Sequence, residues 1–244
     1  MNTHILNPYS ERFGQFAVAR STWERQWLNW SVFWRRWFLR WRVRSGVIMK
    51  RAFDIVGSIA FLIAFSPLYL VLALLVKLED RGPVFFGQTR TGRLGGEFQM
   101  YKFRSMRLNA EAEFGKLLAQ NQHAEGVTFK MKNDPRITRV GKWLRRFSLD
   151  ELPQFVNVLK GGMSLVGPRP PTPREVSRYS LADRRRLAVK PGLTCLWQVG
   201  GRSNIDFSGQ VKLDVQYIES AGFWVDIKIL IQTVRAVVGG NGAC

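Results

Sequence analysis

The residue types best suited to chemistry are concentrated within residues 144–170. This stretch contains Arg145, the adjacent carboxylates Asp150 and Glu151, and Arg169 within a Gly-Pro-Arg-Pro run. Arginine forks match the geometry of phosphate oxygens. A carboxylate beside them can act as a nucleophile or bind a divalent metal. The combination predicts a phosphoryl-transfer site.

The same residues allow a plainer interpretation. Ser148 and Glu151 have the S-x-x-E spacing of a capping box, in which both side chains satisfy free amides at the start of a helix. A cap alone explains neither Arg145 nor Arg169, so we favour the phosphate site. The two interpretations can coexist, because a helix N-terminus attracts phosphate.

Composition indicates anionic partners. The 244 residues include 37 Lys and Arg against 18 Asp and Glu, a net charge of +19, which suits nucleic acid, anionic lipid or phosphorylated substrates. Two cysteines, Cys195 and Cys244, exclude a disulfide scaffold. His4 and His123 are too widely spaced to form a metal cluster with them. Any bound metal should therefore be a hard cation on carboxylates.

A hairpin and several helices are expected to position these residues. Strands are predicted over Val84–Gln88 and Phe98–Met106, separated by a glycine-rich turn. A period of two places Lys102 and Arg104 on one strand face, where they either grip a diphosphate or face solvent. Helices are predicted over residues 110–120, around 141–146, across the charged stretch 172–189 and within 206–238. Arg202 follows two glycines in a further loop.

Tryptophan recurs near the N-terminus with a 4-3-4-3-4 spacing, which places every indole on one helical stripe. The residues are Trp23, Trp27, Trp30, Trp34, Trp37 and Trp41. Arginines occupy much of the remaining surface, as in a helix that lies in a membrane interface. A coiled-coil seam has the same spacing, but tryptophan is bulky for such packing, so we favour the interface.

Residues 55–76 contain no charged side chain and are long enough to cross a bilayer. Ser66-Pro67 interrupts the run, and proline within a helix removes a hydrogen bond and favours a kink. Positive residues flank both ends of the run, and such residues prefer the cytoplasmic side of a membrane. We therefore expect a re-entrant hairpin that enters and leaves by one face, rather than a straight spanning helix.

Several long motifs now stand in a diagnostic order. They are KRAFD before the apolar run, KFRSM, NDPRITRVGKWLRRFSLDELPQ, MSLVGPRP, KPGLTCLWQV and GR. From Lys50 to the C-terminus the chain thereby resembles the bacterial sugar transferase family, the monotopic phosphoglycosyl transferases. It looks most like the catalytic part of the larger enzymes that prime exopolysaccharide or O-antigen synthesis.

The resemblance implies a mostly helical α/β monotopic membrane protein with a re-entrant kinked helix, interfacial amphipathic helices and a small β-hairpin. Three parts are expected: residues 1–48 as a tail and Trp/Arg-rich interfacial helix, 49–80 as the re-entrant helix, and 81–244 as the catalytic domain. The expected location is the cytoplasmic face of the bacterial inner membrane, in contact with anionic lipids.

The resemblance further implies transfer of a sugar 1-phosphate from a UDP-sugar, UDP-glucose or UDP-galactose, to undecaprenyl phosphate with release of UMP. It makes Asp150 the nucleophile, Glu151 its assistant, and both of them ligands of Mg²⁺ or Mn²⁺. The residues expected to bind phosphate and the nucleotide sugar are Arg145, Arg169, Lys102, Arg104 and Arg202. Ser66 and Pro67 are expected to form the membrane bend.

Two positions depart from the family. Cys195 stands where glycine is frequent, and Ser203 follows Arg202 where asparagine or aspartate is common; whether they bear on sugar choice is left open. A basic nucleic-acid binder and a non-catalytic membrane scaffold are the alternatives. The sequence contains no RNP, KH or zinc-finger pattern, and a scaffold gives no reason for the clustered arginines and carboxylates. We therefore expect an enzyme without a nucleic-acid partner.

Overall fold

The computed structural model describes residues 22–110, 112–113, 131, 134–200 and 205–238. The chain divides into two compact units, residues 1–49 and 50–244. Helix α2 (Thr22–Ala64) begins in the first unit and ends in the second.

Within the first unit, α2 exposes the tryptophan stripe. Five indoles, from Trp23 to Trp37, are between 44 and 72 % exposed. Trp34 makes edge-to-face contacts with Trp30 and Trp37, with ring centroids 5.7 and 5.4 Å apart. The helix predicted from the tryptophan spacing is confirmed, and its indoles form a ladder along one stripe.

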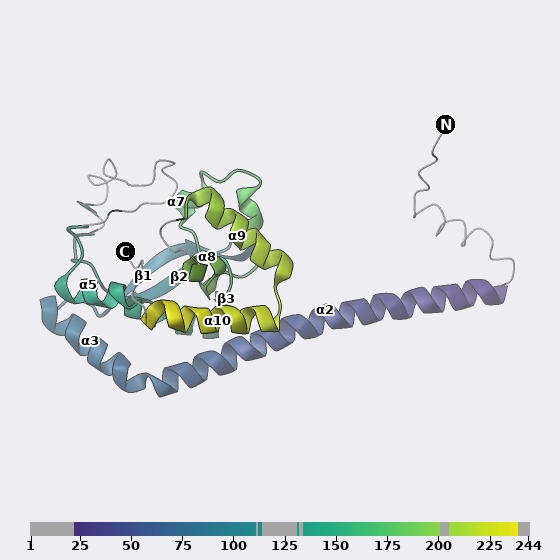
Figure 1. Cartoon of the computed structure of the whole chain (residues 1–244), viewed down its shortest axis with the longest axis horizontal. Coiled ribbons are helices and arrows are strands. Elements are labelled where there is room, and N and C mark those ends of the chain that lie inside the picture. Colours follow the sequence, from purple (N-terminus) through teal and green to yellow (C-terminus); the bar gives the residue numbers. More distant parts are fainter. Residues whose placement is uncertain (1–21, 111, 114–130, 132–133, 201–204, 239–244) are drawn as a thin grey trace. The chain divides into compact units, whose positions relative to one another are not determined.

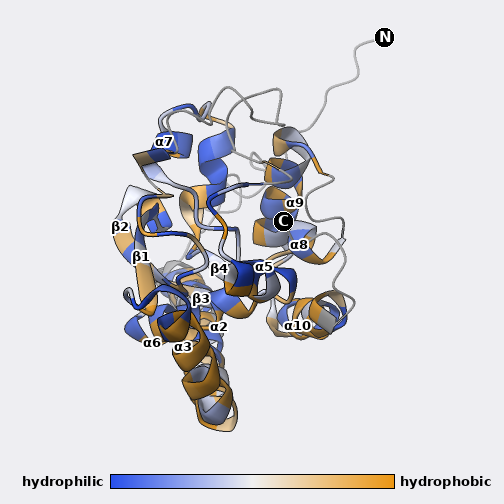
Figure 2. Ribbon diagram, turned by 90° about the vertical axis from the view of Figure 1, so that its left-hand side faces the viewer, coloured by the Kyte–Doolittle hydropathy of each residue, from blue (hydrophilic) through white to orange (hydrophobic). Residues whose placement is uncertain are grey.

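The apolar run is bent, as predicted. Helix α2 ends at Ala64, and α3 (Ser66–Asp80) begins with proline in its first turn (Figure 1). In the described part of the chain no single helix is both long and apolar enough to cross a membrane. The pair Ser45–Ala64 and Ser66–Asp80 meets that test only jointly, with a 65° bend between the helices. Figure 2 shows that hydrophobic residues dominate α3.

The predicted hairpin is also confirmed. Strands β1 (Phe85–Thr91) and β2 (Glu97–Phe103) are antiparallel, and Phe86 lies opposite Lys102. A short 3₁₀ turn, η1 (Arg93–Gly95), joins them. Together with the helices, this hairpin confirms the mostly helical fold with a small β element.

A second, parallel pair was not predicted. Strands β3 (Ser164–Val166) and β4 (Gly192–Thr194) are each three residues long. Their backbones approach closely where Gly192 meets Gly167, because a Cβ on Gly192 would lie 2.0 Å from the Gly167 nitrogen. Side chains at either position would therefore separate the two strands.

Helices cover these strands. They are α5 (Arg139–Arg146), η3 (Leu149–Glu151), α6 (Gln154–Lys160), α7 (Pro173–Val176), η4 (Asp183–Ala188), α8 (Leu196–Gly200), α9 (Phe207–Ser220) and α10 (Phe223–Val238). The helix expected within residues 110–120 lies mostly outside the described residues.

Two expectations about these helices need correction. The charged stretch 172–189 is not one helix but α7 and η4 with a break between them. The side chains of this stretch are also not all exposed, because Arg186 is buried and ion-paired with Asp214 of α9. The expected helix within 206–238 is interrupted at Ala221 and Gly222, giving α9 and α10.

Two of the apolar clusters in the second unit involve the elements around the site. One joins β2, α6, β3, α9 and α10 around Met163 and Val158, which are fully buried. The other packs Leu72 and Val76 of α3 against Phe103 of β2 and Leu144 of α5. Through Leu144, this second cluster holds α5, the helix that precedes the Asp150 segment in the sequence.

Candidate active site

A short turn between α5 and α6 carries the two carboxylates. The Thr138 side chain caps α5 by accepting a hydrogen bond from the Gly141 amide. After α5, Ser148 adopts a left-handed conformation with φ of 55°, and Asp150 and Glu151 follow in η3. The alternative capping box is not formed, since Ser148 makes no side-chain cap bond among the described residues and α6 begins only after Pro153.

Lys102 of β2 reaches both carboxylates. Its Nζ lies 2.6 Å from Glu151 Oε1 and 3.7 Å from Asp150 Oδ2. Asp150 is 5 % exposed. The structure thus brings together three of the predicted site residues, two from η3 and one from the hairpin.

The two carboxylates differ electrostatically. Burial raises the pKa of Asp150, and the charge of Glu151 adds to this effect, while Lys102 and Arg145 oppose it. Burial also acts to raise the pKa of Glu151. There the charge and hydrogen bond of Lys102, with the charges of Arg169 and Arg90, prevail and lower the pKa. Paired acids with pKa values shifted in opposite directions are typical of catalytic sites.

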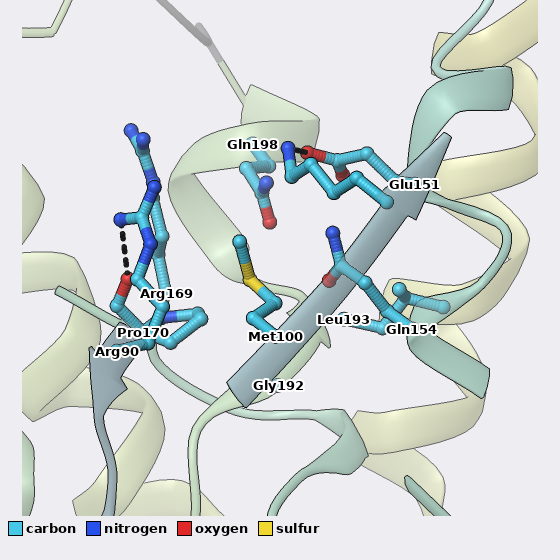
Figure 3. A pocket seen from close by; sticks show the side chains of 10 residues that line it. Arg90, Met100, Glu151, Gln154, Arg169, Pro170, Gly192, Leu193 and Gln198 are labelled. Carbon is cyan, nitrogen blue, oxygen red and sulfur yellow. Dashed lines mark hydrogen bonds and ion pairs between the residues drawn. The ribbon is translucent and has the colours of Figure 1, made fainter. Parts of the chain in front are cut away.

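A cavity of about 270 Å³ adjoins this pair. Its lining comprises Arg90, Met100, Lys102, Glu151, Gln154, Arg169, Pro170, Gly192, Leu193 and Gln198 (Figure 3). The predicted Arg169 therefore lies on the same cavity as Lys102 and Glu151. Its guanidinium carbon is 6.0 Å from the centroid of the Trp197 ring.

The loop that carries Arg169 is fixed by backbone and side-chain bonds. The Gly192 amide donates to the Pro168 carbonyl, and the Thr91 amide donates to the Pro171 carbonyl, both at 2.8 Å. Arg90 Nη1 donates to the Pro170 carbonyl at 3.0 Å. The closeness of β3 and β4, together with the end of β1, therefore determines where Arg169 lies.

Arg90 is a site residue that sequence reasoning missed. It lines the cavity, and burial together with the charge of Arg169 lowers its pKa to about 10. Two guanidinium groups held near each other favour an anion between them. The sequence contained only a weak signal, a positive residue just beyond the predicted first strand of the hairpin.

The other predicted residues are placed differently. Arg145 is half-buried, donates through Nε to Ser105 Oγ at 3.1 Å and acts electrostatically on Asp150. Arg104 is not among the residues that line this cavity, and its role in phosphate binding stays a prediction. It follows the last residue of β2 and forms a part-buried ion pair with Asp80 at the end of α3.

Three further predicted residues lie apart or outside. Ser66 and Pro67 form the bend between α2 and α3, where the Ser66 hydroxyl donates to the Ile63 carbonyl at 2.9 Å. Arg202 and the neighbouring Ser203 lie outside the described residues.

The KRAFD motif proves to be a set of anchors. Lys50 pairs with Asp226 of α10 at 2.5 Å. Arg51 donates to the carbonyls of Val158 and Leu159 at the end of α6, at 2.6 and 2.8 Å. The remaining anchor is Asp54, which accepts hydrogen bonds from the hydroxyl of Ser164 and the amide of Leu165 in β3. These bonds join α2 to the segments behind the cavity.

The carboxylates also suit a hard metal ion. No group of three or more His, Cys, Asp and Glu side chains gathers in the part of the chain that the structure describes. Magnesium, however, is usually held by one or two carboxylates together with substrate phosphates and water. Asp150 and Glu151, adjacent and beside a cationic cavity, fit that donor set.

Comparisons with known proteins place the chain in a family. The family model described as bacterial sugar transferase matches residues 45–240, and the chain belongs to this family. It is 50 % identical over 200 residues to the galactosyl transferase CpsE of Streptococcus agalactiae, covering 82 % of this chain and 44 % of the relative.

Two further relatives have names that include the lipid carrier. The undecaprenyl-phosphate galactose phosphotransferase of Salmonella typhimurium is 47 % identical, over 82 % of this chain and 42 % of the relative. The undecaprenyl-phosphate glucose phosphotransferase of Komagataeibacter xylinus is 36 % identical, over 96 % of this chain and 41 % of the relative. The chain thus spans less than half the length of these curated relatives.

Proposed function

We propose that this protein transfers a sugar 1-phosphate from a UDP-sugar, UDP-glucose or UDP-galactose, to undecaprenyl phosphate, releasing UMP. The observation that carries the proposal is the buried Asp150 beside the Lys102 and Glu151 pair, on a cavity that also presents Arg90 and Arg169. The names of the relatives, which include galactose and glucose phosphotransferases of undecaprenyl phosphate, support the substrate class.

In the proposed reaction, an Asp150 oxygen attacks the phosphorus that bears the sugar. An Asp150–phosphate bond forms, the bond to the second phosphate breaks, and UMP leaves with the electron pair. A phosphate oxygen of undecaprenyl phosphate then attacks the same phosphorus and releases the Asp150 carboxylate. The products are UMP and a diphosphate-linked lipid sugar, so atoms and charge balance.

A carboxylate that attacks an anionic phosphorus needs its repulsion offset. Lys102 lies against the attacking group, and Arg169 and Arg90 face the cavity where the diphosphate would lie. Asp150 and Glu151 would hold Mg²⁺ or Mn²⁺, which supplies charge neutralisation of the diphosphate. Arg145 and Arg202 are proposed to assist phosphate binding.

The bent helix pair is proposed to be re-entrant, with both ends of the chain on the cytoplasmic side of the bacterial inner membrane. The positive flanks of the run and the 65° bend support this topology. A site at the interface lets a water-soluble donor and a lipid acceptor use one nucleophile in turn. The product would serve polysaccharide synthesis as its first membrane-bound sugar.

Replacement of the nucleophile tests the proposal. Asp150→Asn preserves shape but removes nucleophilicity, so UMP release with undecaprenyl phosphate should fall by several orders of magnitude. Without acceptor, a donor labelled in its sugar should label the wild-type protein and not the variant. Glu219→Gln is the matched control, since that side chain is 63 % exposed on α9. Near-normal turnover of Asp150→Asn would refute the covalent mechanism.

A further inference from the structure

The cavity contains a buried amide that the phosphoryl chemistry does not use. Gln154, the first residue of α6, is 3 % exposed and lines the cavity. Figure 3 shows its carboxamide pointing into the space between Glu151 and Met100. An amide both donates and accepts hydrogen bonds, so this side chain is placed to bind a ligand with polar atoms.

A second amide lines the same cavity and is held from behind. Gln198 of α8 accepts a hydrogen bond through Oε1 from the Cys195 thiol at a sulfur–oxygen distance of 3.1 Å. Cys195 follows β4 and is 1 % exposed. Burial raises the pKa of Cys195, which keeps the thiol protonated as a donor. With its oxygen engaged, Gln198 retains its NH₂ donors for a ligand.

We propose that this amide-lined cavity is the sugar-recognition pocket, in which Gln154 and Gln198 hydrogen-bond the hydroxyls of the hexose and Cys195 positions Gln198. The inference rests on the proposed function and adds its sugar subsite. Amides both donate and accept hydrogen bonds, as sugar hydroxyls do. Met100 and Leu193 provide an apolar surface for the C–H face of the ring.

The position of the cavity favours the sugar over the nucleoside as its occupant. Glu151 and Lys102 line this cavity, and Lys102 Nζ is 3.7 Å from the Asp150 carboxylate that would attack. The attacked phosphorus carries the sugar directly, whereas the uridine is one phosphate further away.

Donor selectivity and nucleotide inhibition together test the pocket. Gln198→Leu should raise the KM for UDP-hexoses about tenfold, in line with the loss of one good hydrogen bond. It should also narrow the discrimination between a UDP-hexose and its deoxy analogues, while the inhibition constant of UMP stays unchanged. Gln154→Leu should act in the same direction. Gln216→Leu, on the exposed face of α9, is the matched control.

The Cys195 variants test the positioning role. Cys195→Ala removes the donor and should reproduce part of the loss of discrimination, whereas Cys195→Ser keeps a donor and should restore it. Gln198→Met provides a second variant if the leucine change disturbs folding, as judged by thermal melting.

Two outcomes would overturn the inference. One is an equal loss of activity with every UDP-sugar in the glutamine variants, with the discrimination between a UDP-hexose and its deoxy analogues unchanged. The other is an equal weakening of UMP inhibition, which would place the nucleoside here. Failure of the wild type to release UMP from any UDP-sugar would instead refute the proposed function itself.

Discussion

Lys102 is the positively charged residue that lies next to both carboxylates of the site. It contacts both carboxylates, and its charge opposes the effect of burial on each. In the proposed reaction Asp150 must be deprotonated to attack phosphorus, so a side chain that lowers its pKa would also set the acid limit of that reaction. A neutral residue at position 102 would leave the buried Asp150 and the half-buried Glu151 beside each other without that positive charge.

Lys102→Met should therefore shift the acid limb of the pH–rate profile upward. Removal of the positive charge raises the pKa of Asp150 further, so the carboxylate is lost at a higher pH as the solution is acidified. Measuring UMP release between about pH 5 and pH 9 checks this prediction. That pH range extends below and above the ordinary pKa values of His and Cys. Lys142→Met, on the exposed face of α5, should leave the limb in place. An unchanged acid limb in Lys102→Met would contradict the assigned role.

Elements whose pattern is local were predictable, and pairings distant in sequence were not. The tryptophan spacing, the Ser66-Pro67 bend and the glycine turn of the hairpin each act over a few residues, and all three appear in the structure. Strands β3 and β4 are too short to show a period, and 25 residues separate Val166 from Gly192.

The same distinction holds within the site. The carboxylates and Arg169 were found because their motifs are continuous in sequence. The ion pair of Arg104 with Asp80 was not predicted, because the two residues belong to different elements. Arg90 was missed because its proximity to Arg169 arises from the hydrogen bonds that join β1 to the Pro170 loop.

The bend between α2 and α3 yields a prediction about topology. Replacing Ser66 by leucine and Pro67 by alanine restores helix propensity and the missing hydrogen bond, so part of the population should span the membrane. Tags at both termini should be shielded in intact cells for the wild type, with the N-terminal tag labelled from outside in the double variant. Pro83→Ala, beyond the end of α3, is the control. External labelling of the wild-type N-terminal tag would show a spanning helix instead.

At the scale of the molecule, a net charge of +19 accompanies a long exposed aromatic stripe. Arg35 and Arg36 are exposed on the same helix as the indoles. Anionic headgroups complement such a surface, and indoles prefer the boundary between headgroups and acyl chains. A second copy of the same basic helix would instead bring like charges together.

Lipids brominated near the headgroup should therefore quench the tryptophan fluorescence of the reconstituted protein. Replacing Trp27, Trp30 and Trp34 by phenylalanine should reduce the quenched fraction, more strongly in anionic than in neutral vesicles. Leu181→Ala, at a 90 % exposed position between α7 and η4, is the control. Efficient crosslinking between copies along the stripe, without lipid quenching, would favour the coiled-coil alternative.

Asp54 is a fixed point from which the length of α2 up to its bend can be counted. Asp54 is tied to β3, and the helix runs from there to the break at Phe65. At 1.5 Å per residue that segment is about 16 Å long, roughly half of the ~30 Å hydrocarbon thickness of a bilayer. A hairpin of this depth would occupy a single leaflet. Insertion of one residue between Asp54 and Phe65 would rotate the helix beyond it by about 100°. The number of residues between these two points would therefore set both the depth of the α2–α3 bend in the membrane and the direction in which it faces.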